Sequence, residues 1–433
     1  MPLPSSINRK TVSYALYDWG NSAFATTVMA GFFPVFFKQF WSLGSDATSS
    51  TARLGFTNAA AGLIIALLAP VLGAISDRGI HKKHFLLFFT LLGAGFSCAL
   101  YFVGRGNWQL AVLIYIVGTI GFIGSNLFYD SLLIEVAPPA DRDFVSAFAY
   151  SAGYLGGGLL FALNVAMTLN PGFFGLTGPD EAVRLSFLSV GLWWILFGLP
   201  IQFSAREKTA HQQLSLSLIR NAFKQLASTL KDLRNYRPIL IFLLAYWLYI
   251  DGVYTVIKMA VDYGLSLGFR SSSLITALLI TQFVGFPAAL FFGWISGRIG
   301  TIRSIRVALS VYLCVTLYAA FMNTEFEFYI MAVAIGLVQG GVQALSRATF
   351  ANMIPPDKSS EFFGFYNMIG KFAAIFGPVL IATTGLLAHR AGLAETTATR
   401  LGISSISIMF IAGWLLLGVI SRSVAPTKGE GVK

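Results

Sequence analysis

Twelve long apolar runs dominate the sequence, and they constrain the fold more than any other feature. A helix needs about 20 apolar residues to cross the hydrocarbon core of a bilayer, and there it satisfies its backbone hydrogen bonds internally. We therefore predict an all-α integral membrane protein with twelve transmembrane helices. The approximate limits of the runs are 12–41, 54–76, 84–104, 108–136, 143–169, 182–203, 237–263, 272–297, 304–322, 327–353, 361–388 and 400–421.

The composition agrees with a membrane protein and argues against other classes. Only 11% of the 433 residues are charged, against about 25% in soluble domains. Both cysteines, Cys98 and Cys314, lie in apolar runs, so we expect neither a disulfide framework nor a cysteine-based metal site. The four histidines are scattered in or near loops. No nucleophile–base set or nucleotide motif stands out, so we expect no enzyme activity, no cofactor and no bound metal.

The basic residues in the short connections predict the orientation in the membrane. If both termini face the cytosol, the cytosolic segments carry 20 Lys and Arg residues and the opposite segments carry six. Such residues concentrate on the cytosolic side of membrane proteins. The net charge of +11 therefore reflects orientation and not nucleic-acid binding. We expect a monomer surrounded by lipids, in a bacterial inner membrane.

One long connection, 204–236, divides the chain into an N-terminal six-helix bundle, 1–203, and a C-terminal one, 237–433. Within it, apolar residues recur at helical spacing among basic ones, which predicts an amphipathic helix on the cytosolic membrane surface. It is interpreted as a tether, with a regulatory or partner-binding role left open. The apolar positions are Leu216, Ile219, Phe223, Leu226, Leu230 and Leu233.

The two halves repeat each other. The sequence GAISDR at 73–78 corresponds to GWISGR at 293–298, an offset of 220, and the Pro-Pro pair at 138–139 corresponds to the pair at 355–356, an offset of 217. Repeats of this kind are typical of membrane transporters. We therefore expect two parallel copies of one six-helix unit.

This arrangement resembles the major facilitator superfamily. The loop after the second run resembles its signature, a Gly followed four residues later by Asp-Arg and then basic residues, and departs from it at Ile80, where Gly is usual. The resemblance implies gating roles for Asp77 and Arg78, with Asp77 against the helix start at 359–361. The second copy has Gly297 in place of Asp77, so only the first copy has the carboxylate.

Shorter motifs narrow the resemblance to one family. YDWGNSAF at 17–24, QALSR at 343–347, EFFGFY at 361–366 and GK at 370–371 resemble the autophagy-related vacuolar amino-acid effluxers and their bacterial relatives. This implies a transporter, with amino acids as a candidate substrate class, and leaves the substrate open.

Polar residues inside the runs are functional candidates, because a charge at mid-bilayer costs at least about 2.5–3.5 kcal/mol. In the resembled fold, the first, fourth, seventh and tenth helices line a central cavity. Asp18 has an alternative role in bonding neighbouring hydroxyls. Asp251 lies about 20 Å from its helix start and is the deepest carboxylate. The candidates for substrate binding or coupling are Asp18, Asn21, Asn126, Asp251, Thr255, Lys258, Gln339 and Gln343.

Asp130 and Arg347 form a predicted pair. The offset of 217 superimposes them, and each lies eight residues before its Pro-Pro pair, about 12 Å inside the helix end. Because the fourth and tenth helices face each other in the resembled fold, we predict a salt bridge that acts as a cytosolic gate. The alternative is that each charge is satisfied within its own half.

Two other patterns predict packing. The run GYLGGG at 153–158 lies inside an apolar run, which indicates close helix contact and not a phosphate-binding loop. Tyrosines and tryptophans near the span ends are interpreted as membrane-interface anchors.

These features predict a secondary transporter that moves a small polar or zwitterionic solute by alternating access. Coupling to protons is expected, because Asp18, Asp130 and Asp251 can be protonated. Three alternatives stay open: a drug or organic-ion exporter, a lipid scramblase or flippase on the same fold, and a membrane receptor without transport activity. The sequence predicts neither the direction of transport nor its stoichiometry.

Overall fold

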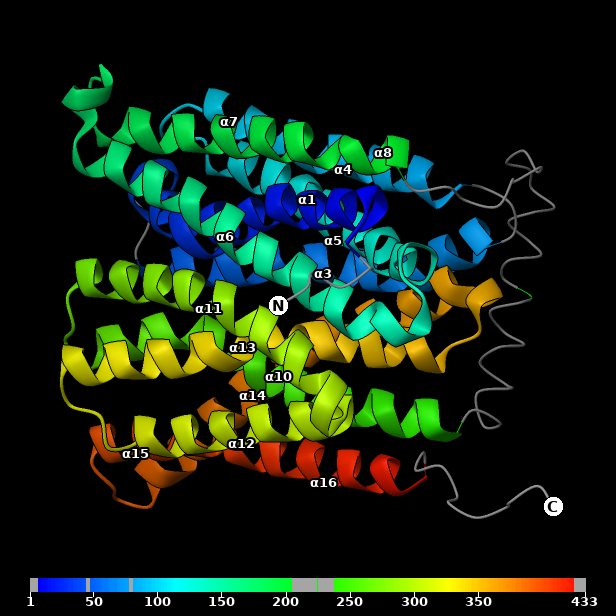
Figure 1. Cartoon of the computed structure of the whole chain (residues 1–433). Helices are drawn as coiled ribbons and strands as arrows, with labels where there is room; N and C mark the ends of the chain where they lie inside the picture. Colours follow the sequence, from blue (N-terminus) through cyan, green and yellow to red (C-terminus); the bar gives the residue numbers. More distant parts are fainter. Residues whose placement is uncertain (1–6, 44–46, 78–80, 205–223, 225–236, 424–433) are drawn as a thin grey trace, which may run out of the picture.

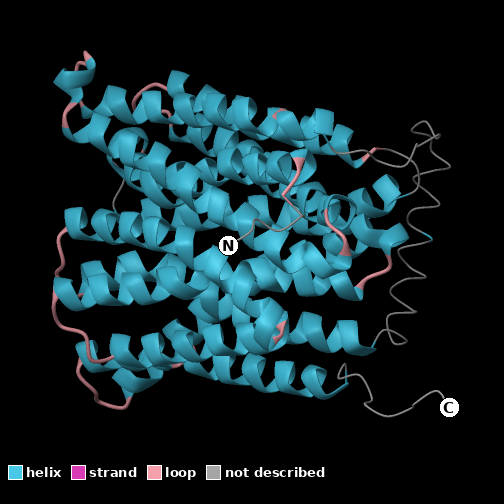
Figure 2. Cartoon of the chain, in the orientation of Figure 1, coloured by secondary structure: helices cyan, strands magenta, loops and turns pink. Residues whose placement is uncertain are grey.

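The computed structural model describes residues 7–43, 47–77, 81–204, 224 and 237–423. Helices form nearly all of this part of the chain (Figure 2). The first half begins with one continuous helical span built from four segments. Its elements are α1 (Arg9–Ala23), η1 (Phe24–Phe32), α2 (Phe33–Phe36), η2 (Phe37–Trp41), α3 (Ala47–Asp77), α4 (Lys82–Ala99), η3 (Leu100–Phe102), α5 (Trp108–Val136), η4 (Pro139–Asp141), α6 (Arg142–Leu169), η5 (Pro171–Phe174), α7 (Pro179–Gly198) and α8 (Pro200–Ser204).

The second half repeats this pattern of long helices. Its elements are α10 (Arg237–Ser266), α11 (Ser271–Ile299), α12 (Thr301–Ala319), α13 (Glu325–Met353), η7 (Pro356–Lys358), α14 (Ser359–Arg390), α15 (Glu395–Ser404) and α16 (Ser407–Ser423). The amphipathic helix predicted within 204–236 lies outside the described residues.

Each predicted apolar run coincides with one helical span, which confirms the predicted fold class. Among the described residues, eleven spans are long and apolar enough to cross a membrane. The helix α14, with 32 residues, takes the place of the remaining predicted run.

The last span differs from its prediction, because it is interrupted between α15 and α16 at Ser405 and Ile406. The hydroxyl of Ser404 donates to the carbonyl of Arg400 (2.9 Å), and the hydroxyl of Ser405 donates to that of Gly402 (2.5 Å). Such side-chain bonds compete with the helical ladder, and here they lie where the helix breaks.

The two halves lie side by side in Figure 1, with α1 to α8 in blue to green and α10 to α16 in green to red. Across the interface, α3 and α5 pack on α14, and α6 packs on α11 and α13. The end of the molecule where α8 ends and α10 begins is called the linker side below. The start of α1 also lies there, since the hydroxyl of Ser13 donates to that of Ser204 at 2.6 Å.

The sequence repeat appears as a structural repeat. Helices α5 and α13 each have 29 residues, and one residue separates the end of each helix from its Pro-Pro pair. A three-residue 3-10 turn follows in each copy, and then another long helix begins. Proline suits the first turn of a helix because its missing N–H has no partner there. The prediction of two parallel copies is confirmed.

Glycines set the distance between α1 and α6. A Cβ on Gly156 would lie 2.5 Å from the ring and the carbonyl of Trp19, and one on Gly157 would lie 3.0 Å from the Thr26 hydroxyl. The run at 153–158 therefore packs helix against helix, as predicted. This contact brings the polar face of α1 close to α6.

Candidate functional site

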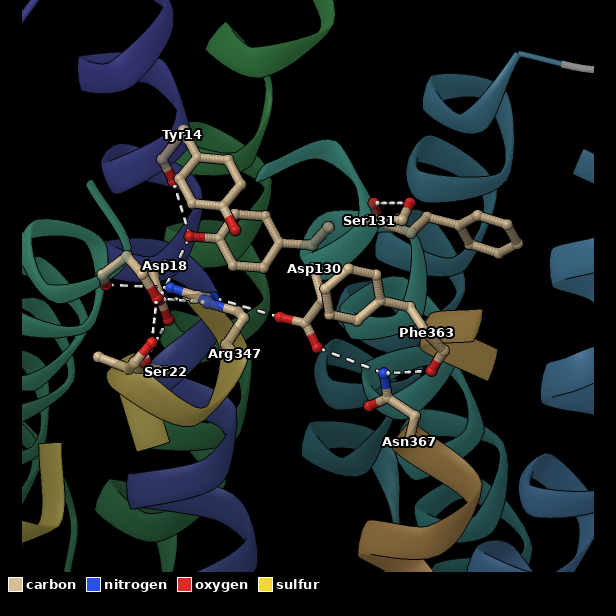
Figure 3. A network of polar contacts seen from close by, with 12 residues as sticks. Tyr14, Asp18, Ser22, Asp130, Ser131, Arg347, Phe363 and Asn367 are labelled. Carbon is tan, nitrogen blue, oxygen red and sulfur yellow. Dashed lines mark hydrogen bonds and ion pairs between the residues drawn. The ribbon is translucent and has the colours of Figure 1, made fainter. Parts of the chain in front are cut away.

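A buried ion cluster joins the two halves across their interface. The side chain of Arg347, on α13, is 2% exposed, and its Nη1 lies 3.2 Å from Asp130 Oδ1 and 3.8 Å from Asp18 Oδ2. Figure 3 shows the guanidinium between these carboxylates of α5 and α1. The guanidinium also donates to the hydroxyl of Ser146 (2.9 Å) and to its carbonyl (3.1 Å). Its positive charge is therefore paired across the interface.

Three tyrosine rings surround the same guanidinium. Its Cζ lies 5.4 Å from the ring centre of Tyr14, 5.2 Å from that of Tyr129 and 4.4 Å from that of Tyr150. The rings of Tyr14 and Tyr129 stack at 4.2 Å. A cation within about 6 Å of a ring centre is attracted by the electrons of the ring face, so these rings add to the attraction of the carboxylates.

Further hydrogen bonds hold the two carboxylates in place. Asp18 accepts from the Ser22 hydroxyl (3.0 Å) and from the Tyr129 hydroxyl (3.2 Å). Asp130 accepts from the amide of Asn367, on α14, at 3.3 Å. The predicted contact between Asp130 and Arg347 is confirmed, and Asp18 also bonds hydroxyls, as its alternative role proposed. The gating role of the pair stays a prediction.

A second contact between the halves lies at the end of α3. The two carboxylate oxygens of Asp77 accept from the backbone N–H of Ser360 (3.0 Å) and of Glu361 (2.7 Å). These N–H groups belong to the first turn of α14, where the helix dipole attracts an anion. The resemblance predicted this location. We call the contact the Asp77 latch.

Other polar contacts also join the two halves on the linker side. Lys82 bonds Glu135 and the hydroxyl of Ser359, both at 2.7 Å. Arg142 donates to the carbonyl of Ala351 and to Asn352 Oδ1, both at 2.9 Å. The hydroxyl of Thr301 bonds Asp143, and that of Ser146 bonds the carbonyl of Ala344. In this structure the halves are joined on the linker side.

Asp251 and Thr255 lie elsewhere, inside the C-terminal half. Asp251 is fully buried on α10 and accepts the backbone N–H of Gly377, on α14, at 3.1 Å to each oxygen. The hydroxyl of Thr255 donates to the same carboxylate at 3.2 Å. These two residues join α10 to α14 and are not part of the contacts around Arg347 described above.

The remaining candidates are distributed around the cluster. Asn21 is buried on α1, and Asn126 is half-buried one turn before Asp130 on α5. Gln339 is buried and Gln343 half-buried, two turns and one turn before Arg347 on α13. Arg78 and the side chain of Lys258 lie outside the described part of the structure.

The sequence interpretation missed the tyrosines. Tyr14, Tyr129 and Tyr150 were not among the candidate site residues, and they enclose a buried cation. One signal was available: Tyr14 precedes Asp18 by four residues, and Tyr129 adjoins Asp130, so two of these rings accompany the intramembrane carboxylates. Ser146, whose hydroxyl and carbonyl both bind Arg347, had no such signal.

The fold defines the class of protein. The human organic anion transporter MFSD10 (TETRAN), a solved structure, resembles the chain with a TM-score of 0.69 at 16% identity, over 96% of this chain and 100% of that chain. An uncharacterized MFS-type transporter of Bacillus subtilis (strain 168), YxiO, is 38% identical over 95% of both chains. The protein is a multi-pass membrane protein with the major facilitator fold, and its relatives are transporters.

The family follows from a match along most of the chain. The family model described as "Vacuole effluxer Atg22 like" matches residues 42–138 and 135–423, and the chain belongs to this family. Autophagy-related protein 22 of Yarrowia lipolytica is 25% identical over 55% of this chain, and the match covers 44% of that protein's length. The predicted resemblance to the vacuolar effluxers is confirmed.

Proposed function

We propose that the protein is a secondary transporter that moves a small polar or zwitterionic solute, with amino acids as the candidate class, by alternating access. One observation carries the proposal: two carboxylates and a guanidinium are buried together at the interface between the halves. Buried charges are costly in a membrane, so their presence indicates function. A zwitterion needs both signs of charge in its site, and this cluster offers both.

The amides near the cluster support a polar substrate. Asn126, Gln339 and Gln343 lie within two turns of the charged residues on α5 and α13, and amide groups can both donate to and accept from a substrate. An exporter of lipophilic ions needs a largely apolar cavity instead. The family's description as an effluxer supports export as the direction.

In the proposed cycle the linker side faces the cytosol, as the ratio of 20 to six basic residues suggests. The contacts described on that side then correspond to a cytosol-closed state. Opening requires the Asp77 latch and the pair of Asp130 with Arg347 to separate, so the proposal gives both a gating role. The two halves would rock against each other about a central site at mid-depth.

Proton coupling is the second part of the proposal. Asp18, Asp130 and Asp251 are buried carboxylates, and protonation removes the cost of their charge when a partner leaves. Asp251 is the first candidate, because it binds a backbone N–H within one half and can be neutralised without breaking the central pair. Asp251→Asn should abolish acceleration of transport by a pH gradient and spare exchange.

Counterflow in proteoliposomes tests the function. The purified protein should accumulate a labelled neutral amino acid against an internal unlabelled pool, and Arg347→Gln should lose most of this activity. Gly297→Ala is the matched control, because a Cβ there has open space around it. Competition only by lipophilic cations would favour the exporter, and movement of labelled lipid between leaflets would favour the scramblase.

A further inference from the structure

The guanidinium of Arg347 occupies a site that is built by the opposite half of the molecule. Arg347 is on α13, in the C-terminal half. The groups that surround it come from α1, α5 and α6, in the N-terminal half: Tyr14, Asp18, Tyr129, Asp130, Ser146 and Tyr150. Among these contacts, the C-terminal half supplies the cation and the N-terminal half supplies its surroundings.

The chemistry of these surroundings is that of a cation receptor. Two carboxylates lie 3.2 and 3.8 Å from one guanidinium nitrogen, and three tyrosine rings lie within 5.4 Å of its Cζ. Proteins use ring faces together with carboxylates to recognise ammonium and guanidinium groups. We call these five residues together with Ser146, which accepts two bonds from the guanidinium, the cation cage.

Several parts of the cage are held by bonds that do not involve Arg347. Tyr129 donates to Asp18 and to the carbonyl of Tyr14, and its ring stacks on those of Tyr14 and Tyr17. Ser22 also donates to Asp18. Because these bonds lie within the N-terminal half, they can persist when α13 moves, so that half of the molecule keeps a preorganised site.

Withdrawal of Arg347 leaves this site with excess negative charge. If α13 separates from α5 and α6, Asp18 and Asp130 lose their shared cation while remaining among aromatic rings. Removing one partner of a buried ion pair is strongly unfavourable because the other charge is left uncompensated. Once Arg347 has withdrawn, a cation from solution that reaches the cage can take the place of its guanidinium.

We propose that the cation cage binds the ammonium or guanidinium group of the transported substrate, and that Arg347 and this group compete for it. The inference rests on the proposed function and adds the receptor for the positive end of the solute. Because substrate enters the cage only after Arg347 leaves, binding favours separation of the halves on the linker side. A ligand that binds one state shifts the population toward it. Arg347 thereby couples binding of substrate in the cation cage to opening of the linker side.

The first test uses methylguanidinium as the probe and the full-length purified protein. In Arg347→Gln the cage is vacant, so methylguanidinium should raise the midpoint of thermal unfolding saturably, by about 3 °C or more. The wild type should show a much smaller shift at the same concentration, because its own guanidinium competes. Equal shifts in both proteins, or none in the variant, would overturn the proposal.

Variants of the cage identify the binding site. Adding Tyr150→Leu or Asp18→Asn to Arg347→Gln should reduce the shift at least threefold. The matched control is Tyr312→Leu, which removes a buried tyrosine that stacks on Phe410 in the C-terminal half at 5.2 Å. If the control reduces the shift as much as the cage variants do, the probe binds elsewhere.

A second measurement keeps Arg347 and so does not depend on the stability of its variants. Ser360 is fully buried on the linker side. In a protein with Ser360→Cys and with Cys98 and Cys314 replaced by serine, methylguanidinium should increase the rate of thiol labelling severalfold. A labelling rate that does not change with the probe would contradict the coupling of occupancy to opening.

The two proposals can fail separately. If amino acids show no counterflow but methylguanidinium stabilises Arg347→Gln, the cage stands and the zwitterionic substrate is wrong. If counterflow occurs and Tyr150→Leu and Asp18→Asn, each made in the protein that keeps Arg347, leave the KM for the amino acid unchanged, the transport function stands and the cage is wrong.

Discussion

Two equivalent helix crossings lie on the linker side. Each has a glycine where its two helices approach closely, but their polar contacts differ. In the first, α3 crosses α14 at Gly73, and in the second, α11 crosses α6 at Gly293, 220 residues later. A Cβ on Gly73 would collide with the carbonyl of Ser360, and one on Gly293 would lie 2.5 Å from the Cβ of Ala147. The close approach of the helices is therefore conserved between the halves.

The charges at the two crossings are arranged differently. Asp77 ends α3 and accepts two backbone N–H groups of α14. At the second crossing Gly297 replaces this carboxylate, and Asp143, in the first turn of α6, accepts instead from the Thr301 hydroxyl. The first crossing joins a charge to a helix dipole, and the second joins a carboxylate to one hydroxyl. We infer that small residues preserve the shape of the repeat while the two crossings differ in strength.

The largest expected effect comes from the pair of Asp130 with Arg347. Its helices contact both crossings, because α5 packs on α14 of the first and α13 packs on α6 of the second. Asp130→Ala removes the nearer carboxylate of Arg347, and Arg347→Ala removes the cation that Asp18 and Asp130 share; loss of one partner of a buried pair typically costs about 3–5 kcal/mol. Both crossings should then open on the linker side and transport should fall at least about 100-fold. Cross-linking across each crossing, together with counterflow, measures this.

Exchanging the two charges is the control for the central pair. Asp130→Arg combined with Arg347→Asp should recover part of the activity that either single variant loses. A double-mutant cycle that gives no coupling energy between the positions would remove the pair from the gate.

The next effect distinguishes the crossings by their shape. Gly73→Leu places a side chain where the backbone of Ser360 lies, so the first crossing cannot close, and transport should be nearly abolished. Gly297→Leu meets open space at its Cβ and should retain most activity. Labelling of Ser360→Cys in each background measures closure, and equal labelling would show that α3 and α14 do not close as described.

A smaller effect distinguishes the crossings by their charge. Asp77→Asn removes an anion from a helix start, worth about 1–2 kcal/mol, and should slow transport roughly 10-fold with normal folding and surface expression. Asp143→Asn, which keeps a partner for the Thr301 hydroxyl, should slow it less. Wild-type rates in Asp77→Asn, or a stronger defect in Asp143→Asn, would reverse the proposed order of strength.

The smallest effect concerns the edge of the first crossing. Glu135 is partly exposed and pairs with Lys82 at 2.7 Å, and exposed or partly exposed pairs contribute about 0–1 kcal/mol. Glu135→Gln should therefore reduce transport about two- to threefold, and high salt should reduce the wild-type rate toward that of the variant. A 10-fold loss would mean that Lys82 controls the latch directly.

The sequence predicts the helices and their repetition well, because these depend on local properties. Apolar length determines each span, and the Pro-Pro pairs mark equivalent helix ends. The repeat offset places Asp130 and Arg347 at equivalent depth, and the resembled fold implies that their helices face each other. The pairing of Asp77 with the start of α14 came from a family resemblance, and the structure places its partners at Ser360 and Glu361.

Other contacts depend on information that a linear pattern does not contain. Enclosure of Arg347 by Tyr150 depends on the rotation of α6 about its axis, which the glycine contacts with α1 determine only after folding. The partner of Asp251 is a backbone N–H, which every residue except proline possesses. No residue type in the sequence therefore distinguishes Gly377 as that partner.

The bond between Asp251 and Gly377 gives α14 the properties of a lever. The backbone N–H of Gly377 donates to Asp251 on α10, and the next residue, Pro378, has no N–H. The helix is therefore easier to bend there than along its regular turns. The Asp77 latch at Ser360 lies 17 residues away, about 25 Å along the axis. A rotation of about 5° at this point displaces the latch by about 2 Å, which is enough to break hydrogen bonds of 3.0 and 2.7 Å. Under the proposed coupling, a change of charge at Asp251 would therefore move the Asp77 latch on the linker side.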